Sequence, residues 1–354
     1  MIYVLQGHDL KHAVEEMLLH LQPTERPVYV SEPPEGDCCI SRLELDGSTA
    51  RAQAEVRLDG STQTAERSAS VEGLTGLAQK RVVTEIVKLA LYDAMVPHLA
   101  VRPAWGSLTG VRPAKLARGL MARGLTRGQT AQRFRERYGV TAERTALTMR
   151  AAAFAQAALE RLPENEVSLY IGIPFCPSRC AYCSFVSHSI EKSAALIPPY
   201  VDALCAELAD TGALLREGGM RVSSIYIGGG TPTTLSPDEL SRMMDSVSQH
   251  FDLSHLQEYT VEAGRPDTIT REKLAAIRKG GAGRVSINPQ SMNDQVLQNI
   301  GRRHTAHEVL EAYALAREIG FDVINMDTIA GLEGDTPESF VHTIDTLIGL
   351  EPEN

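Results

Sequence analysis

Three of the chain's six cysteines lie in one short segment, IPFCPSRCAYCSF, at residues 173–185. Their spacing is Cys176-x3-Cys180-x2-Cys183. A structural zinc site takes four protein ligands, usually from two well-separated pairs. The sequence has no second pair, and the nearest additional candidate is His188. Three thiolates on one loop therefore favour an iron–sulfur cluster that leaves one iron open to a substrate or cofactor.

The other cysteines give no disulfide framework. Cys38 and Cys39 are adjacent in an apolar segment, and Cys205 lies in an apolar stretch of a predicted helix. We expect all three to be packing residues, with a redox pair as the alternative for Cys38 and Cys39. The segment MIYVLQGHDLKHAVEE does not have the apolar stretch of a signal peptide, and no apolar run approaches the length of a membrane span. The sequence therefore predicts a cytoplasmic protein with no membrane partner.

The second half of the chain alternates apolar and helical segments. Strands are predicted at 167–173, 222–228, 258–263, 284–288 and 322–327, and helices near 194–216, 236–250, 270–279, 292–319 and 336–349. This alternation predicts a parallel sheet with crossover helices, whose chemistry lies beyond the carboxyl ends of its strands. The following polar and special residues come after the five strands in turn: the cysteines, GGGTPT, Glu262, Asn288 with Gln290, and Asp327. We therefore expect them on one rim.

The first half of the chain has a different character. Residues 1–5 and 9–21 predict a strand and a helix, a hairpin is expected around Asp46-Gly47, and residues 78–95 predict a long helix. Residues 102–150 carry eleven Arg and Lys against Glu136 and Glu143, in short helices expected to break at the glycines. The predicted division is a small α/β domain at 1–100, a basic helical connector at 101–165 and the parallel-sheet domain at 166–354. The four glycines at which the short helices are expected to break are Gly119, Gly124, Gly128 and Gly139.

The net charge of −10 gives no global sign of a nucleic-acid partner. The basic stretch is either a solvated face or a site for a polyanion, with Arg102 and Arg112 the foremost candidates to hold substrate carboxylates. RNA is less favoured because few aromatic side chains accompany the arginines.

The cysteine loop resembles that of radical S-adenosylmethionine (SAM) enzymes. Five motifs occur in the order found in the oxygen-independent coproporphyrinogen III oxidase group: LYIGIPFCPSRCAYCSF, IYIGGGTPTTL, VEAGRPDTI, INPQSMNDQVLQNIGRRHT and INMDTIAGL. The segment WGSLTGVRPAKL and the region around it are similar to the coproporphyrinogen dehydrogenase (HemZ-like) branch. The resemblance implies a partial (β/α)6 TIM-like radical SAM barrel preceded by a small α/β N-terminal domain. Its cofactors would be a 4Fe–4S cluster and SAM.

Five of the six strands of such a barrel are predicted, and EPEN stands where the sixth should begin. We therefore expect the domain at 166–354 to be truncated before its last strand, with an exposed edge on the fifth. Residues 1–354 are then not expected to complete decarboxylation, although the cluster and some SAM binding should survive.

The resemblance also implies a role for each matching residue. Cys176, Cys180 and Cys183 would ligate the cluster and, with Tyr170, act in catalysis. Tyr170 would contact SAM near the cluster, and Tyr182 would pack near the adenine. The remaining matches would form the loop that receives the methionyl amino group (Gly228, Gly229, Gly230 and Thr231) and would hold the SAM ribose, carboxylate and neighbouring groups (Glu262, Gln290, Arg302 and Asp327).

The activity that the resemblance implies is oxidative decarboxylation of coproporphyrinogen III. A 5′-deoxyadenosyl radical would remove a hydrogen from a propionate, and loss of carbon dioxide and one electron would leave a vinyl group, giving protoporphyrinogen IX after two such events. The partners would be this tetrapyrrole and an electron-donating reductase or flavodoxin-type protein.

The loop departs from the well-known oxidases at Ser184-Phe185, where they carry another cysteine. The heme-chaperone branch, similar in fold, also does not have that cysteine. A heme-binding chaperone and an RNA-modifying radical SAM enzyme therefore stay open as alternatives. For His304 and His307, which flank a predicted helix start, we expect capping or solvent exposure rather than ligation.

Overall fold

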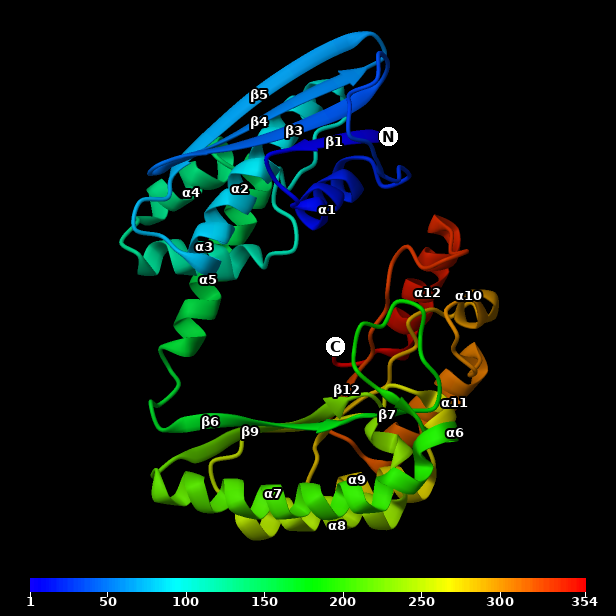
Figure 1. Ribbon diagram of the computed structural model, residues 1–354. Coiled ribbons are helices and arrows are strands. Elements are labelled where there is room, and N and C mark those ends of the chain that lie inside the picture. The colour runs from blue at the N-terminus through cyan, green and yellow to red at the C-terminus, as the bar shows by residue number, and fades with distance from the viewer. The chain divides into compact units, whose positions relative to one another are not determined.

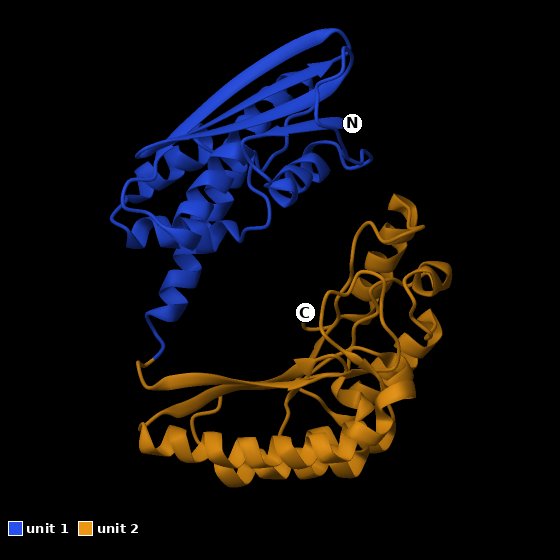
Figure 2. Cartoon of the chain, in the orientation of Figure 1, with its two compact units in different colours: residues 1–162 blue, residues 163–354 orange.

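The computed structural model describes all 354 residues, which separate into two compact units. Unit 1 comprises Met1–Leu162 and unit 2 comprises Pro163–Asn354 (Figure 2). No helix is long and apolar enough to span a bilayer. The three-part division predicted from the sequence stays a prediction.

Unit 1 is built on a five-stranded sheet of order β2-β1-β3-β4-β5. β1 pairs in parallel with its two neighbours, whereas β3, β4 and β5 form an antiparallel meander. The hairpin expected around Asp46-Gly47 is confirmed as the β3–β4 connection. The strand bounds are β1 (Ile2–Gln6), β2 (Val28–Tyr29), β3 (Cys38–Asp46), β4 (Thr49–Leu58) and β5 (Ser61–Ser70).

Two helices, α1 (Lys11–Leu21) and α2 (Gly76–Met95), share a core with this sheet. The periodicity of the sequence predicted both. Cys39 lies in this core, and Cys38 lies in a small cluster with Val4 and Ile40. Both cysteines are completely buried, and burial raises the pKa of the Cys39 thiol. The expectation that they are packing residues is confirmed.

Three further helices complete unit 1: α3 (Pro113–Ala122), α4 (Arg127–Glu136) and α5 (Ala142–Leu159). They share a second core with Leu89 of α2. The expected breaks at Gly124 and Gly139 are confirmed, because both follow a helix with positive φ. The breaks expected at Gly119 and Gly128 are wrong, since both residues lie inside helices. A glycine inside a helix costs only about 1 kcal/mol relative to alanine, which packing of the helix can offset.

Unit 2 contains a parallel sheet of order β12-β11-β10-β9-β6, which confirms the five predicted strands. In Figure 1, α7 and α8 lie along the face of the sheet below β6 and β9. The strands are β6 (Glu166–Ile173), β9 (Arg221–Gly229), β10 (Glu258–Glu262), β11 (Arg284–Ser286) and β12 (Val323–Asn325).

The crossover helices are α7 (Ile197–Glu217), α8 (Pro237–His250), α9 (Arg271–Lys279), α10 (Asp294–Asn299), α11 (Ala306–Ile319) and α12 (Pro337–Leu350). The loop after β6 adds a short parallel pair, β7 (Phe175–Cys176) with β8 (His188–Ser189), and the one-turn helix α6 (Ile190–Ser193). The strands and the crossover helices other than α10 bury one continuous apolar core, and α10 packs in a separate small cluster with Ile300 and Leu332.

The single helix predicted at 292–319 is wrong, because the chain breaks it into α10 and α11. Gly301 follows α10 with a φ of 77°, a left-handed conformation that suits glycine. Thr305 and Glu308 then form a capping box that starts α11. The break leaves residues 300–304 free to turn toward the carboxyl ends of the strands.

The two edges of the unit 2 sheet are β6 and β12, so the cysteine loop follows an edge strand. At the other edge, Asn354 pairs with β12 as a parallel neighbour would. The backbone carbonyl of Asn354 accepts from the Met326 amide at 2.9 Å, and its backbone amide donates to the Ile324 carbonyl at 3.4 Å. EPEN, where the sequence predicts a further strand, therefore approaches β12 at its last residue.

Candidate active site

The rim formed by the carboxyl ends of the unit 2 strands contains a cavity of about 160 Å³. Its walls come from the loops after β6, β9, β10 and β11 and from the break between α10 and α11. Ten of the residues predicted from the sequence line it: Cys176, Cys180, Tyr182, Cys183, Gly229, Gly230, Thr231, Glu262, Asn288 and Arg302.

The glycine loop after β9 lies directly against the first part of the cysteine loop. The amides of Gly230 and Thr231 donate to the carbonyls of Ile173 and Phe175, both at 2.7 Å. The Thr231 hydroxyl lies 3.5 Å from the Cys176 sulfur. A Cβ on residue 230 would sit 2.6 Å from the Phe175 carbonyl oxygen and 2.9 Å from that sulfur. Glycine is therefore required here by the close approach of the two loops.

Arg265, for which the sequence predicted no role, holds the middle of the cysteine loop. Arg265 is only 4% exposed. Its Nη1 donates to the Ser178 carbonyl at 3.2 Å and to the Cys180 sulfur at 3.6 Å, and its Nη2 donates to the Ser178 hydroxyl at 2.9 Å. The feature of the sequence that could have indicated this role is the position of Arg265, three residues after Glu262 at the end of a predicted strand.

Asp267 supports this arginine from behind. Its carboxylate accepts from the Arg265 Nε at 3.3 Å, and it lies 3.7 Å from the His304 Nδ1. Burial disfavours the charge on Asp267, but His304 and the Arg265 guanidinium outweigh it and hold the pKa of the carboxyl at about 2. His304 is buried, with neither ring nitrogen hydrogen-bonded. The expectation of capping or exposure for His304 is therefore wrong.

Arg302 ties the break between α10 and α11 to three other loops. Its Nη1 donates to the carbonyls of Gly264 at 3.0 Å and Asn288 at 2.6 Å, and its Nη2 donates to the Tyr182 hydroxyl at 3.1 Å. The Nε is buried with no partner. The Oδ1 of Asn288, which lines the same cavity, is also buried and unpartnered. A ligand with both acceptor and donor groups would satisfy these two atoms.

The same break contacts the cysteine loop through its backbone. The Ser178 hydroxyl donates to the Gly301 carbonyl at 2.7 Å, and the Ala181 amide donates to the Ile300 carbonyl at 3.0 Å. The loop that carries the cysteines is thus fixed by residues more than 100 positions later in the chain.

Glu262 begins a column of side chains that crosses three strands. It accepts a hydrogen bond from the Tyr226 hydroxyl, and burial raises the pKa of its carboxyl. Tyr170 stacks on Tyr226 with ring centroids 5.8 Å apart. A Cβ at Gly228 would lie 2.7 Å from the Tyr226 ring, so this glycine makes room for the column.

Tyr170 does not line the cysteine cavity. It is 61% exposed and borders a neighbouring hollow of about 300 Å³, which shares Gly229 and Gly230 with the cysteine cavity. Gln290 and Asp327 also lie outside it. The backbone amide of Gln290 donates to the backbone carbonyl of Asp327 at 3.0 Å, and the Asp327 carboxylate accepts from the Asn325 side chain at 2.9 Å. The roles of these residues stay predictions.

A family model described as the radical SAM superfamily matches residues 170–347, a span that includes all three clustered cysteines and both loops against them. The chain belongs to the radical SAM superfamily. Its five-stranded parallel sheet is the partial radical SAM barrel predicted from the sequence, and the cofactors of the superfamily are a 4Fe–4S cluster and SAM.

The residues of this radical SAM chain fit those cofactors. The three cysteines are free thiols that line one cavity, and each can ligate a different iron. No group of three His, Cys, Asp or Glu side chains is arranged to hold a single metal ion. The unpartnered Arg302 Nε and Asn288 Oδ1 offer a donor and an acceptor to the polar groups of SAM.

The chain is similar to two curated proteins of Bacillus subtilis. It is 38% identical over 275 residues to the oxygen-independent coproporphyrinogen-III oxidase-like protein HemZ of Bacillus subtilis, covering 77% of this chain and 55% of the relative. It is 37% identical over 188 residues to the heme chaperone HemW of the same organism, covering 53% of this chain and 48% of HemW.

A solved structure of coproporphyrinogen III oxidase (HemN) from Escherichia coli, described as a radical SAM enzyme, is 34% identical with a TM-score of 0.49. The match covers 56% of this chain and 45% of that structure. The chain thus spans about half the length of the curated relatives it matches.

Proposed function

We propose that this chain takes part in the radical SAM oxidation of coproporphyrinogen III, in which two propionate side chains become vinyl groups. The observation that carries the proposal is the extent of the similarity to the HemZ protein. That match of 275 residues is longer than unit 2 and so extends into unit 1, whereas the HemW match of 188 residues does not exceed unit 2. The name of that relative refers to coproporphyrinogen oxidation, whereas HemW is named a heme chaperone.

The cavity would bind SAM through groups already held in place. Arg302 is buried and fixed by two carbonyls and Tyr182, so its free Nε can meet the SAM carboxylate with little loss of side-chain entropy. Glu262 would accept from the ribose hydroxyls, and the backbone at Gly229–Thr231 would receive the methionyl amino group. These roles are the ones that the family resemblance implies.

With both cofactors bound, the site supplies the one-electron chemistry that removes a hydrogen atom from a propionate. The chain itself would orient the cofactors and the substrate and shield the site from water. Cys176, Cys180 and Cys183 would hold the cluster, and Arg265 keeps their loop against the rim. An electron-donating reductase or flavodoxin-type protein is the proposed partner. The three cysteines are only partly buried, which would let a donor protein approach the cluster.

The second candidate is a heme-binding chaperone. It is favoured by the 37% identity to HemW and by Ser184-Phe185, the segment in which the well-known oxidases carry another cysteine. The two candidates share a cluster and a SAM site and differ in whether a hydrogen is taken from a propionate.

The test is isotope transfer. Anaerobically reconstituted chain is mixed with SAM, reductant and coproporphyrinogen III deuterated at the propionate β-carbons, and 5′-deoxyadenosine is examined by mass spectrometry. The proposal expects deuterium in that product, which reports the first chemical step without requiring a complete turnover. Unlabelled 5′-deoxyadenosine together with stable heme retention would support the chaperone instead. Labelling only from an RNA substrate would move the chain to the modifying enzymes.

A further inference from the structure

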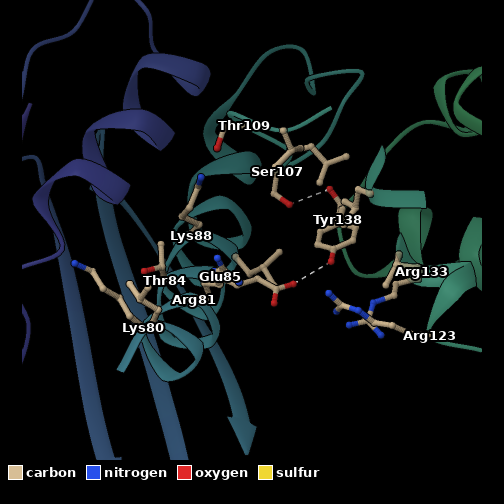
Figure 3. A pocket seen from close by; sticks show the side chains of 16 residues that line it. Lys80, Arg81, Thr84, Glu85, Lys88, Ser107, Thr109, Arg123, Arg133 and Tyr138 are labelled. Atoms are coloured by element: carbon tan, nitrogen blue, oxygen red, sulfur yellow. Dashed lines mark hydrogen bonds between the residues drawn. The ribbon is translucent and has the colours of Figure 1, made fainter. Parts of the chain in front are cut away.

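Unit 1 contains a cavity of its own, with a volume of about 510 Å³. It lies between α2 and the segment from Ser107 to Tyr138, and all its lining residues belong to unit 1 (Figure 3). The volume falls within the range of about 300–1,000 Å³ that small-molecule sites occupy in proteins. The radical SAM site does not use this cavity, so it needs an explanation of its own.

The walls of the cavity are largely apolar. Leu89 and Leu120 line it as part of the second core of unit 1, with Leu108 and Leu116 packed beside them. At the mouth, Leu77 is 74% exposed and so offers further apolar surface. An occupant with an apolar body would gain about 25 cal/mol for each Å² of apolar surface removed from water.

The rim of the cavity is basic. Four cations line it without an acidic partner: Lys80, Arg81, Arg123 and Arg133. Glu16 pairs with Lys88 at 2.8 Å and Glu85 pairs with Arg137 at 3.0 Å. Glu136, which lines the adjoining hollow, accepts from the Gln132 side chain at 3.0 Å and forms no ion pair with Arg123 or Arg133. Glu85 also accepts from the Tyr138 hydroxyl at 3.0 Å.

Arg123 and Arg133 concentrate this charge at one place. Both line the cavity and the shallower hollow beside it, and Figure 3 shows their guanidinium groups next to one another. The Nε of Arg133 is buried and has no hydrogen-bond partner. Two neighbouring cations that form no ion pair with a carboxylate repel each other, and a bound anion reduces that repulsion.

We propose that this cavity binds a small amphipathic polyanion, a molecule with an apolar body and at least two carboxylate groups. The body would occupy the leucine-lined interior, and the carboxylates would meet Arg123, Arg133 and the lysine and arginine of α2. Arg102 and Arg112, which the sequence predicted as the foremost candidates to hold substrate carboxylates, do not line the cavity. Two sources have this chemistry: a tetrapyrrole with propionate groups, which rests on the proposed function, and a long aliphatic dicarboxylate, which does not.

The experiment measures binding to the full chain with the dye bis-ANS, an apolar body with two sulfonates. A double variant, Arg123→Gln with Arg133→Gln, is compared with Arg127→Gln and Arg135→Gln. This second double variant is the control: it also removes two positive charges, but from exposed positions of α4 that do not line the cavity. We expect the dissociation constant to rise at least about tenfold in the first variant, because each hydrogen bond to a charged group contributes roughly that factor, and less than about twofold in the control.

Competition then identifies the source of the anion. Displacement of bis-ANS by coproporphyrin III assigns the cavity to a tetrapyrrole, and displacement by hexadecanedioate assigns it to an aliphatic diacid. Equal dye binding by the two double variants, or displacement by neither carboxylate, would overturn the proposal. The measurement needs neither the cluster nor SAM, so its outcome is independent of the isotope-transfer experiment.

Discussion

The guanidinium of Arg265 donates to the sulfur of Cys180 at 3.6 Å and, through the same nitrogen, to the Ser178 carbonyl two residues earlier. One buried cation from the loop after β10 thus fixes both the backbone and a thiol of the loop after β6. Arg265 therefore places the loop that carries the three cysteines.

Replacing Arg265 by Gln should release the cysteine loop. We expect the iron content after anaerobic reconstitution to fall to less than half, and the loss to be partly rescued by Lys, which restores the charge but not the planar fork. The matched control is Arg271→Gln, an exposed arginine paired with Glu318. Iron and sulfide assays with a thermal melt check this. Full iron loading of a folded Arg265→Gln variant would remove the residue from the site.

The three cysteines should act as a set. Anaerobically purified protein should be brown, and Ser at position 176, 180 or 183 should abolish both cluster retention and SAM cleavage, because each ligand is needed to close the cluster. Cys205→Ser, in the partly buried face of α7, should keep both. Absorbance, iron content and 5′-deoxyadenosine formation are the measurements. A colourless wild-type chain with one equivalent of zinc would contradict the cluster.

Arg302 and its neighbour Arg303 form a natural comparison. Arg302 is buried in the rim, whereas Arg303 is 60% exposed on its side chain and pairs with Glu191 at 2.7 Å. Arg302→Ala should weaken SAM binding by about 1–3 kcal/mol, and Arg303→Ala by less than about 0.5 kcal/mol. Equilibrium dialysis with labelled SAM measures both. Unchanged affinity in Arg302→Ala and in Glu262→Ala would show that SAM lies elsewhere.

Gly230→Ala tests the close approach of the two loops. The added methyl would meet the Phe175 carbonyl oxygen and the Cys176 sulfur inside van der Waals contact, so the cysteine loop must move. We expect reduced cluster retention with a folded unit 2. Gly349→Ala, where nothing lies within 4 Å of the new Cβ, should leave the cluster intact and stabilise α12 by up to about 1 kcal/mol. Equal iron content in the two variants would refute the steric explanation.

Asp267 should make the stability of unit 2 depend on pH. Its pKa of about 2 in the folded chain lies below the ordinary value of 3.8, so its stabilisation is complete above pH 4 and is lost as the pH falls through 2. Asp267→Asn should cost about 2 kcal/mol at pH 7 and about half of that at pH 3. Urea unfolding at both pH values measures the difference. Asp202→Asn, in an exposed pair with Arg242, should cost less than about 0.5 kcal/mol. A penalty for Asp267→Asn that does not change with pH would exclude this linkage.

The parallel sheet was predictable because each strand is a short apolar run followed by a helix with a clear start signal. Ser236 with Glu239 and Thr305 with Glu308 are capping boxes in the sequence and in the structure. β5 was missed because STQTAERSAS has almost no apolar residues. Its pairing with β4 along the whole strand, rather than burial of its side chains, makes it a strand.

The site was predictable where a residue type reports its own chemistry, as cysteine and glycine do. Arg265 and His304 could not be identified in this way, because burial and contacts define their roles, and both depend on loops that meet only in the folded chain. Tyr170 shows the reverse case. The family pattern points to it, but in the structure its ring lies on Tyr226 and faces a neighbouring hollow.

The clamp on the cysteine loop has a consequence for how the protein is made. A ribosome releases the cysteines at 176–183 well before it has made Arg265. The turn at 300–302, whose backbone carbonyls accept hydrogen bonds from Ser178 and Ala181, is made later still. During that interval the three thiols belong to a loop without its anchors. Cluster delivery by the assembly machinery of the cell is therefore expected to follow completion of the fourth strand and its helix, as a late event in biogenesis rather than a co-translational one.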